Sequence, residues 1–345
     1  MTAERAAAAI RLADIAAHAG VSEATVSRVL NGKPGVGGDT RQVVLAAMDV
    51  LGYERPVRTR QRSAGLIGLV IPELDNPIFP AYAQAIETLL TRHGYTPIFC
   101  TLTPGGATED EYVEMLMERG VSGIVFVSGL HADTTADSDR YQRLVDRRLP
   151  LVFINGHRPE IPATFFAPDD RHAARLAISY LAELGHERIG LAAGPARFVP
   201  VVRKVEGFLA ASQALLGLDA AAARERISHT FFSVAGGQTA ARQLLERGCT
   251  AAICGSDMMA LGAIRALRDE GLSVPQDFSV IGYDDSPLIA FTDPPLTTVR
   301  QPVQAIAQAA VGTLLEELSG LDGPKDEFVF APELVVRGST AAAPR

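Results

Sequence analysis

Apolar residues recur at helical spacing near the N-terminus, in the segment RLADIAAHAGVSEATVSRVLN. Leu12, Ile15 and Ala19 share one face of a first helix. Gly20 is predicted to end that helix, because a residue without a Cβ adopts the left-handed turn easily. Ser22 is a good N-cap for a second helix. The pattern therefore predicts two short helices joined by a glycine-containing turn, a helix-turn-helix.

From residue 66 onward the pattern changes to short apolar runs separated by amphipathic segments. Apolar runs that alternate with helices indicate βαβ units and parallel sheets buried on both faces. The runs form two series, which predict two sheets and hence two lobes, and the fold class is α/β. The candidate strands begin near Ile67, Ile98, Ile124 and Val152 in the first series, and near Ile189, Thr230, Ala251 and Ser279 in the second.

Local signals refine the predicted helices of this part. Thr108 and Glu111 have the spacing of a capping box at a helix start. Gly262 interrupts the helical segment MMALGAIRAL, which predicts close packing against a neighbouring element. His186, in LGHERIG, is expected to pack or cap at a helix end rather than to catalyse.

Length and charge change this picture in one respect. The 345 residues favour two or three domains at roughly 150 residues each, and 47% hydrophobic residues exclude a disordered chain. The net charge of −8 argues against nucleic-acid binding, but it is unevenly distributed. Residues 1–62 carry nine Lys and Arg against six Asp and Glu, a net +3, and the remainder carries −11. A basic head on an acidic body keeps DNA binding by the head open.

Several other function classes lack their sequence signature. The longest apolar runs have about six to eight residues, far fewer than the roughly 18 of a membrane helix. No secretion signal is evident, so we expect a cytoplasmic protein without membrane contact. Cys100, Cys249 and Cys254 are expected to be buried, reduced thiols. No phosphate loop, metal-ligand spacing or nucleophile elbow is present, so we expect no cofactor, metal or catalytic residue. An enzyme whose active-site residues are scattered along the chain stays an alternative.

The exposed face of the second predicted helix carries candidate DNA contacts. Its residues are Glu23, Ala24, Thr25, Ser27, Arg28 and Asn31. Small and hydroxyl-bearing side chains allow close approach to DNA, and an arginine can form two hydrogen bonds to a guanine edge. The alternative is an ordinary pair of helices whose exposed residues are simply solvated.

The string AGVSEATVSRVLNG, followed by a third helix over Thr40–Leu51 and the phrase LGY, resembles the DNA-binding signature of the LacI/GalR family of bacterial transcription regulators. The resemblance implies base-edge contacts from Glu23, Ala24 and Arg28. It implies mainly phosphate contacts from four further residues, Ser22, Thr25, Ser27 and Asn31.

The linker ERPVRTRQRSAGL departs from the family pattern. The family forms a short hinge helix here, and a leucine from it enters the minor groove, but this chain has no leucine between Leu51 and Leu66. Arginines are crowded instead, at Arg55, Arg58, Arg60 and Arg62. One interpretation is a solvated, flexible linker. The other is an electrostatic clamp in which Arg58 and Arg60 bind phosphates or a narrow minor groove.

Polar residues cluster after the predicted strands of the body, where ligands of doubly wound folds bind. They are Asp75, Asn76, Asn155, Ser256, Asp257, Asp284 and Asp285, with Phe79, Phe198 and Tyr283 nearby. Short polar side chains beside aromatic rings suit a polyhydroxylated ligand. The alternative is that the Asp and Asn side chains cap the helices that follow.

The body also resembles the family, through the phrases NPIF, SDMMALGAIRAL, SVIGYDD and PPLTTVRQP. The resemblance implies a two-lobed, periplasmic-binding-protein-like body that the chain crosses three times. It implies effector contacts from Asn76, Phe79, Asn155, Ser256 or Asp257, and Asp284. Two positions depart from the family. The effector contact of the usual arginine is expected from Lys204 as a point charge or from Arg203 one residue earlier, and Ser256 stands where sugar-responsive members often have asparagine.

These observations predict three segments. Residues 9–54 form the DNA-binding domain, 55–65 the arginine-rich hinge linker, and 66–340 the domain for effector binding and dimerisation. The first lobe is expected at about 66–160 and 291–325. The second is expected at about 161–290 and 326–340.

The phrases LGYERPVR, SGLHADTTAD and RKVEGF resemble, more narrowly, a maltose-operon regulator branch of actinobacteria. The resemblance implies a homodimeric repressor (a tetramer is possible) that binds double-stranded operator DNA and is released by a small sugar, maltose or a maltodextrin. A corepressor-type or activating regulator with another effector shares every motif. A solute-binding protein would lack residues 1–62, and a sugar-acting enzyme has no supporting constellation.

Overall fold

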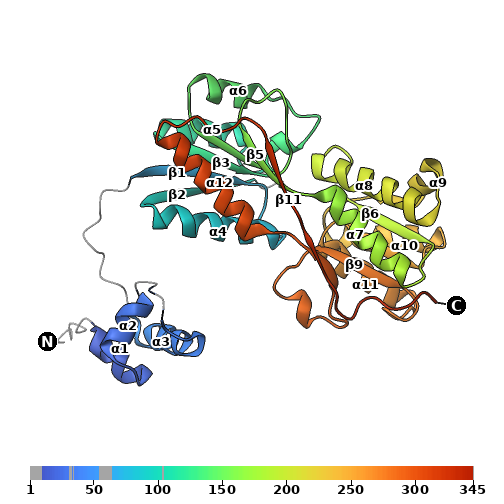
Figure 1. The fold of residues 1–345 in the computed structure, drawn as a ribbon, viewed down its shortest axis with the longest axis horizontal. Helices are drawn as coiled ribbons and strands as arrows, with labels where there is room; N and C mark the ends of the chain where they lie inside the picture. Colours follow the sequence, from blue (N-terminus) through green and yellow to red (C-terminus); the bar gives the residue numbers. More distant parts are fainter. Residues whose placement is uncertain (1–9, 31–32, 34, 54–63, 103–104, 345) are drawn as a thin grey trace. The chain divides into compact units, whose positions relative to one another are not determined.

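The computed structural model describes residues 10–30, 33, 35–53, 64–102 and 105–344. The chain divides into two compact units between residues 62 and 63, called here the head and the body. The head is helical, and both sheets belong to the body (Figure 1). Among the described residues, no helix is long and apolar enough to cross a membrane.

The head consists of α1 (Leu12–Ala19), α2 (Glu23–Leu30) and α3 (Gly38–Leu51). Ile15, Val26 and Val44 have no exposed surface and form its core, one from each helix. Gly20 ends α1 with φ +64°, a left-handed conformation that glycine adopts without steric cost. The predicted helix-turn-helix and third helix are therefore confirmed.

The first lobe of the body is a six-stranded parallel sheet with helices on both faces. Its strands lie in the order β11, β5, β4, β3, β1, β2. Helices α4 and α12 pack on one face and α5 and α6 on the other, as Figure 1 shows. The strands are β1 (Gly65–Ile71), β2 (Tyr95–Thr101), β3 (Gly123–Val127), β4 (Leu151–Ile154), β5 (Thr164–Pro168) and β11 (Glu327–Phe330), and the helices are α4 (Ile78–Arg92), α5 (Glu109–Glu118), η1 (Leu130–Ala132), α6 (Asp139–Asp146) and α12 (Val303–Leu318).

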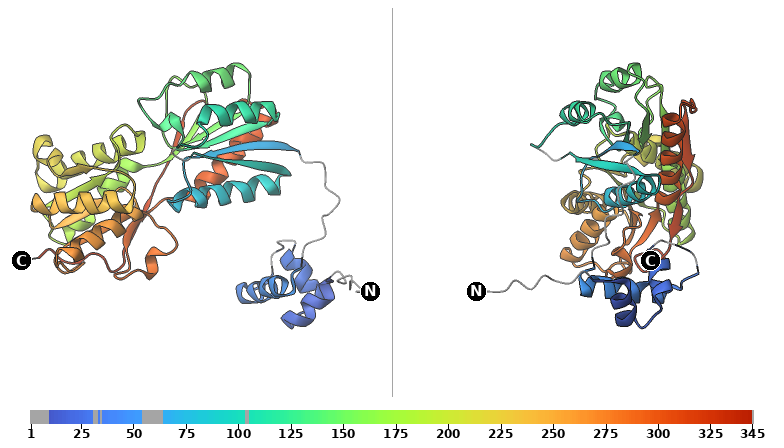
Figure 2. Two further views of the ribbon diagram at one scale, coloured as in Figure 1. Left: turned by 180° about the vertical axis from the view of Figure 1, so that it is seen from behind. Right: turned by 90° about the vertical axis from the view of Figure 1, so that its left-hand side faces the viewer.

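The second lobe repeats this architecture (Figure 2). Its strands lie in the order β12, β10, β9, β8, β6, β7, and only β12 is antiparallel to its neighbour among the described pairs. Helices α7 and α8 cover one face and α10 and α11 the other. The strands are β6 (Ile189–Ala193), β7 (Ile227–His229), β8 (Ala251–Cys254), β9 (Ser279–Asp284), β10 (Thr297–Arg300) and β12 (Glu333–Val335), and the helices are α7 (Asp170–Glu183), α8 (Val199–Leu216), α9 (Ala220–Arg224), α10 (Val234–Glu246), α11 (Asp257–Asp269) and η2 (Ile289–Phe291).

The chain crosses between the lobes three times, as predicted, but at other positions. The crossings follow β5, β10 and β11, at residues 168–170, 300–303 and 330–333, rather than near 160, 290 and 325. The predicted boundaries were wrong because β5 pairs with β4 and β10 pairs with β9, so each strand belongs to the sheet before the crossing. The strand expected near Thr230 was also wrong. That segment follows β7 and leads into α10.

Three of the local predictions are confirmed. The amide of Glu111 donates to Thr108 Oγ1 over 3.2 Å, and the amide of Thr108 donates to Glu111 Oε2 over 2.7 Å, which completes the capping box. A Cβ on Gly262 would lie 2.0 Å from the carbonyl oxygen of Val234, so this glycine allows α11 to pack closely on α10. The three cysteines are buried and free.

His186 is buried at the end of α7, as expected. Its Nδ1 lies 2.9 Å from Thr250 Oγ1, and its Nε2 lies 3.1 Å from both Ser279 Oγ and the carbonyl oxygen of Ala341. Burial lowers the pKa of its imidazole. The ring therefore joins the β8 and β9 entry points to the C-terminal segment, which is a packing role.

Candidate functional sites

The exposed face of α2 carries the predicted DNA-reading residues. Val26 and Val29 are buried in the head core, which turns the opposite side of this amphipathic helix toward solvent. Glu23, Ala24 and Arg28 are exposed on that side. Arg28 makes no ion pair with another described residue, so its guanidinium is available to a base edge or a phosphate.

The first turn of α2 is suited to a phosphate. Ser22 precedes the helix, and the amide of Thr25 donates to Ser22 Oγ over 3.2 Å. The hydroxyl oxygens of Ser22 and Thr25 lie 2.9 Å apart, and Ser27 is partly buried on the same helix. A helix N-terminus carries free amides and a partial positive charge, which favour an anion. Asn31, Arg58 and Arg60, and with them the predicted arginine clamp, lie outside the described residues.

In the body, the carboxyl ends of the two sheets face each other. Asn76 follows β1 in the first lobe, and its side chain interacts with Asp284 at the end of β9 in the second lobe. Gln301, in the second crossing, donates from Nε2 to Asp284 Oδ1 over 2.7 Å and accepts from the hydroxyl of Tyr82 over 3.0 Å. A buried polar chain therefore connects α4 of one lobe to β9 of the other. The sequence indicated Asn76 and Asp284 but not Tyr82 or Gln301.

Two buried oxygen atoms at these strand ends have no hydrogen-bond partner among the described residues: Asn155 Oδ1 and Asp284 Oδ2. Asn155 directly follows β4, and its Nδ2 donates to Ser128 Oγ over 2.7 Å, which fixes the amide. Both residues have positive φ, +64° for Asn155 and +119° for Asp284, a conformation that aims a side chain at some backbone cost. A buried acceptor without a partner costs about 1–3 kcal/mol, and a ligand hydroxyl would supply the missing donor.

The environment of Asp284 disfavours its charged form. Burial raises the pKa of this carboxyl well above its ordinary value, and the neighbouring charge of Asp257 adds to the effect, whereas Gln301 and Lys204 oppose it. A carboxyl of this kind is a strong hydrogen-bonding group in a dry site.

Ser256 and Asp257 are engaged within the second lobe. Ser256 caps α11, because its Oγ accepts from the amide of Met259 over 3.2 Å. Asp257 accepts from the amide of Ser286 over 2.7 Å and from Thr298 Oγ1 over 2.6 Å. Burial raises the pKa of Asp257 to about 6. Ser256 therefore acts as a helix cap. Asp257 holds the loop after β9, and this loop positions Asp284.

Arg203 and Lys204 are both paired in the interior. Arg203 forms a two-pronged ion pair with Glu327 of β11, with nitrogen–oxygen distances of 2.6 and 2.8 Å, and this pair joins the second lobe to the first. Lys204 Nζ lies 2.5 Å from Asp170 Oδ1 and 3.9 Å from the ring centre of Tyr283. Tyr283 also donates to Asp170 Oδ1 over 2.8 Å. Arg203 therefore joins the two lobes, and Lys204 stabilises the start of α7 beside the first crossing. The sequence did not indicate Asp170 or Glu327.

The aromatic candidates differ in position. Phe79 is partly buried and packs against the first-lobe core, at the start of α4. Phe198 immediately precedes α8, and the guanidinium of Arg197 lies 4.6 Å from its ring centre. Among the described residues, no group of three or more His, Cys, Asp or Glu side chains is arranged to hold a metal ion.

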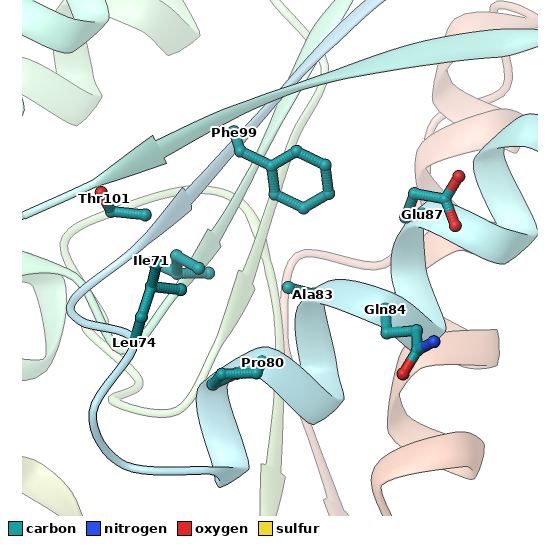
Figure 3. Close-up of a pocket in the computed structure, with 8 residues that line it drawn as sticks. All are labelled: Ile71, Leu74, Pro80, Ala83, Gln84, Glu87, Phe99 and Thr101. Atoms are coloured by element: carbon teal, nitrogen blue, oxygen red, sulfur yellow. The ribbon is translucent and has the colours of Figure 1, made fainter.

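A separate pocket of about 440 Å³ lies on the first lobe, between α4 and the strands β1 and β2 (Figure 3). Phe99 of the edge strand β2 and Leu74 of the loop after β1 are both about half exposed beside it. Figure 3 shows these side chains on the strand side, opposite Pro80 and Ala83 of α4. The remaining lining residues are Ile71, Gln84, Glu87 and Thr101.

Comparison with known proteins matches both units. Residues 11–55 match the profile of the bacterial regulatory proteins of the lacI family, and residues 178–340 match that of a periplasmic binding protein-like domain. The chain is 65% identical to the HTH-type transcriptional regulator MalR of Streptomyces coelicolor, over 97% of each chain. The chain belongs to the LacI family of transcriptional regulators. This LacI-family regulator is a DNA-binding protein and not an enzyme, as the sequence predicted.

Other relatives and solved structures agree with this assignment. The regulator is also 65% identical to the HTH-type transcriptional regulator reg1 of Streptomyces lividans, over 97% of each chain. It resembles the CelR–cellobiose complex with a TM-score of 0.71 and 30% identity, covering 96% of this chain and 99% of that one. It resembles the lac repressor dimer bound to operator with a TM-score of 0.69 and 28% identity, covering 97% and 100%.

Proposed function

We propose that this LacI-family regulator is a repressor of carbohydrate-utilisation genes that a small neutral sugar, maltose or a maltodextrin, releases from its operator. The observation that carries the effector assignment is the pair of unpartnered buried acceptors, Asn155 Oδ1 and Asp284 Oδ2. Acceptors at this place call for a ligand rich in hydroxyl donors. The nearby cation Lys204 is already neutralised by Asp170, and the preceding Arg203 by Glu327, which favours an uncharged sugar over a phosphorylated one.

Asn76 and Phe79 complete the proposed sugar site from the first lobe. Asn76 lies beside Asp284, and Phe79 offers an aromatic face of the kind that packs against sugar C–H groups. Asp257 and Ser256 support the site from the second lobe. The preference for maltose rests on the sequence phrases shared with the maltose-operon branch, and the similar CelR structure contains cellobiose.

On the DNA side, Arg28 is proposed to read a guanine edge, with Glu23 and Ala24 against neighbouring bases. Ser22, Thr25, Ser27 and Asn31 would contact phosphates, and Arg58 and Arg60 would bind phosphates or a narrow minor groove. A two-fold dimer places two such helices on half-sites about one helical turn apart.

The proposed homodimer is supported by exposed apolar side chains of the body. Leu288, just before η2, is 77% exposed, and Phe291, in η2, is 86% exposed. Phe231, after β7, is 74% exposed. Leu74 and Phe99 border the pocket of Figure 3 on the first lobe. These exposed apolar side chains are the candidates for the interface, and a second copy of the chain is the partner that a two-fold operator requires. We place this dimer in the cytoplasm, where the operator is.

Operator binding measured by gel shift, with and without a panel of maltose, isomaltose, trehalose and cellobiose, tests the proposal. We expect maltose to weaken operator binding and the other sugars to have less effect, because an effector that prefers one of two states shifts their populations. Tighter operator binding with a sugar would replace the repressor-inducer scheme with the corepressor alternative. No response to any sugar would remove the effector assignment.

A further inference from the structure

A loop of the first lobe contacts the second lobe directly, away from the crossings. The backbone amide and Oγ1 of Thr134 both donate to the carbonyl oxygen of Arg197, over 2.8 and 2.7 Å. Arg197 Nε lies 2.7 Å from Asp133 Oδ2, and Asp133 forms an isolated antiparallel bridge with Phe198. These contacts join the loop after β3 to the loop after β6. They form a small backbone and side-chain interface, called the latch here.

The latch lies away from the crossings, so rotation of the lobes about the crossings would separate its residues. In the first sheet β3 is separated from the crossing strand β5 by β4, and in the second sheet β6 is separated from β10 by β8 and β9. Contacts displaced from a hinge are those that must break when two lobes rotate apart. Thr134 and Arg197 are also solvent-exposed, so the latch lies at the outer edge of the interlobe surface rather than in its interior.

On the first lobe, the latch loop is held rigidly by a buried network. The amide of Leu130 donates to Glu109 Oε2 over 2.8 Å, and the amide of His131 donates to the hydroxyl of Tyr141, also over 2.8 Å. That hydroxyl in turn donates to Glu109 Oε1. Arg158 anchors the far side of the loop through the carbonyl oxygen of Ala136. Because the loop cannot follow the second lobe, opening must break the contacts to Arg197.

The ion pair of the latch is chemically well formed. Although burial opposes it, hydrogen bonds from Thr135 and the charge of Arg197 hold the pKa of Asp133 below its ordinary value. Thr135 donates to Asp133 Oδ1 from its amide and its hydroxyl, over 2.9 and 2.6 Å. The carboxylate is thereby aimed with Oδ2 toward Arg197.

We propose that the latch formed by Asp133, Thr134 and Arg197 holds the lobes closed over the effector and so sets the effector affinity of this regulator. The proposal rests on the interlobe sugar site proposed above and adds the contacts that keep that site closed. These residues act on the lobe equilibrium and are positioning residues, because the latch contacts run between the loops and not to the strand ends where the acceptors lie. The sequence placed Asp133 and Thr134 in the branch phrase SGLHADTTAD but indicated no role for them, and it did not single out Arg197.

The test uses the full-length protein and a charge-reversal pair. Arg197→Glu places two carboxylates at the latch, and Asp133→Arg combined with Arg197→Glu restores opposite charges. A half-exposed ion pair is worth little, so we expect Arg197→Glu to weaken maltose binding about fivefold by calorimetric titration, and the double variant to recover most of it. Arg242→Glu is the control. Arg242 is exposed to about the same degree as Arg197, and its ion pair with Glu270, a more exposed carboxylate than Asp133, lies wholly within the second lobe.

Hydrogen exchange of the Thr134 amide gives a second readout that needs no sugar. The amide is expected to exchange faster in Arg197→Glu than in the native protein or in Arg242→Glu, and to slow again in the double variant. Equal sugar affinity and equal Thr134 exchange in Arg197→Glu and Arg242→Glu would overturn the latch. If the native protein binds no sugar, the effector assignment fails, and the exchange measurement alone then decides whether the latch exists.

Discussion

Replacing Asp284 by asparagine should affect stability and sugar binding in opposite directions. In the protein without sugar, the carboxyl is buried, Oδ2 has no partner among the described residues, and the charge of Asp257 lies nearby. Asp284→Asn keeps the side-chain shape and the acceptor for Gln301 while it removes the charge. It also suits the left-handed backbone, φ +119°, because asparagine tolerates positive φ. The free energy of unfolding should therefore rise.

The size of the effect follows from the buried charge that the substitution removes, because the asparagine amide would occupy the position of Oδ2 and would lack a partner there as well. Relief of about 1–3 kcal/mol corresponds to a rise in Tm of about 2–8 °C for a unit of this size. The gain should depend on pH. The folded-state pKa of Asp284 is raised, so the stability of the native protein falls as pH rises above the ordinary aspartate value of about 3.9. The Tm difference between variant and native protein should be near zero at about pH 4 and larger at about pH 7.

Sugar binding should change in the other direction. A ligand hydroxyl left without its acceptor in a buried site costs about 1–3 kcal/mol, so loss of the Asp284 acceptor should weaken maltose binding about fivefold to a hundredfold. Thermal unfolding followed by circular dichroism and calorimetric titration with maltose measure the two effects on the same samples.

The adjacent residue provides the control. Asp285 also has positive φ, +60°, but its carboxylate is paired with Arg300 and Arg337, each over 2.6 Å. Asp285→Asn should lower Tm, because it removes the carboxylate charge that both guanidinium groups share, although Arg300 keeps its ion pair with Glu333. If Asp284→Asn lowers Tm as Asp285→Asn does, the buried-charge argument is refuted. An unchanged maltose affinity would show that Asp284 is not a sugar contact.

Three further outcomes are expected. Arg28→Ala should abolish selective operator shifting, a loss of about 1–3 kcal/mol of base discrimination, without a change in thermal unfolding; unchanged selectivity would remove the assignment of α2 as the reading helix. The double variant Arg58→Ala/Arg60→Ala should reduce the slope of log affinity against log salt by about two, measured by operator titration at several salt concentrations, and an unaltered slope would leave the linker as a simple tether. Gly262→Ala should cost about 1–3 kcal/mol of stability, because its Cβ would meet a backbone carbonyl of α10 at 2.0 Å. The control Gly312→Ala, which has open space in α12, should be neutral or stabilising by about 0.5–1 kcal/mol. Equal effects of the two substitutions in urea unfolding would contradict the packing argument.

The helix-turn-helix was predictable because its determinants are local. Gly20 and Ser22 act on their own turn and helix start, and Ile15 and Val26 are close in sequence as well as in space. Neighbouring residues therefore specify both the backbone conformation and the packing of the head.

In the body, the sequence indicated most strands of the two series but not β5, β10 or β11, the strands beside the crossings. Pairing between distant segments decides such strands, as the C-terminal strand β12 shows. β12 has only three residues, Glu333–Val335, and it forms because β10 offers an edge, which is a long-range pairing. The segment at Thr230 has the composition of a strand, but Phe231 faces solvent and Phe232 packs into the core, so its apolar character reflects surface and tertiary contacts rather than strand alternation.

The candidate site likewise contains residues that the sequence indicated and partners that only folding brings to them. Residue type and position after a strand were enough to indicate Asn155 and Asp284, because the carboxyl ends of parallel strands share one edge. The two basic residues of α8 pair with residues distant in the sequence, Asp170 at the start of α7 and Glu327 at the start of β11. The latch residue Arg197 likewise pairs with Asp133, 64 positions away.

By itself, the sequence determined the elements and the chemistry available at their ends: an amphipathic reading helix, two series of buried strands, and polar side chains where those strands stop. The tertiary structure alone decided which of those side chains are satisfied internally, which keep a free acceptor for a ligand, and which join the two lobes. The reason is physical. Helix capping and apolar periodicity act over a few residues, whereas the pairing of a buried polar atom depends on groups that folding brings together from far along the chain.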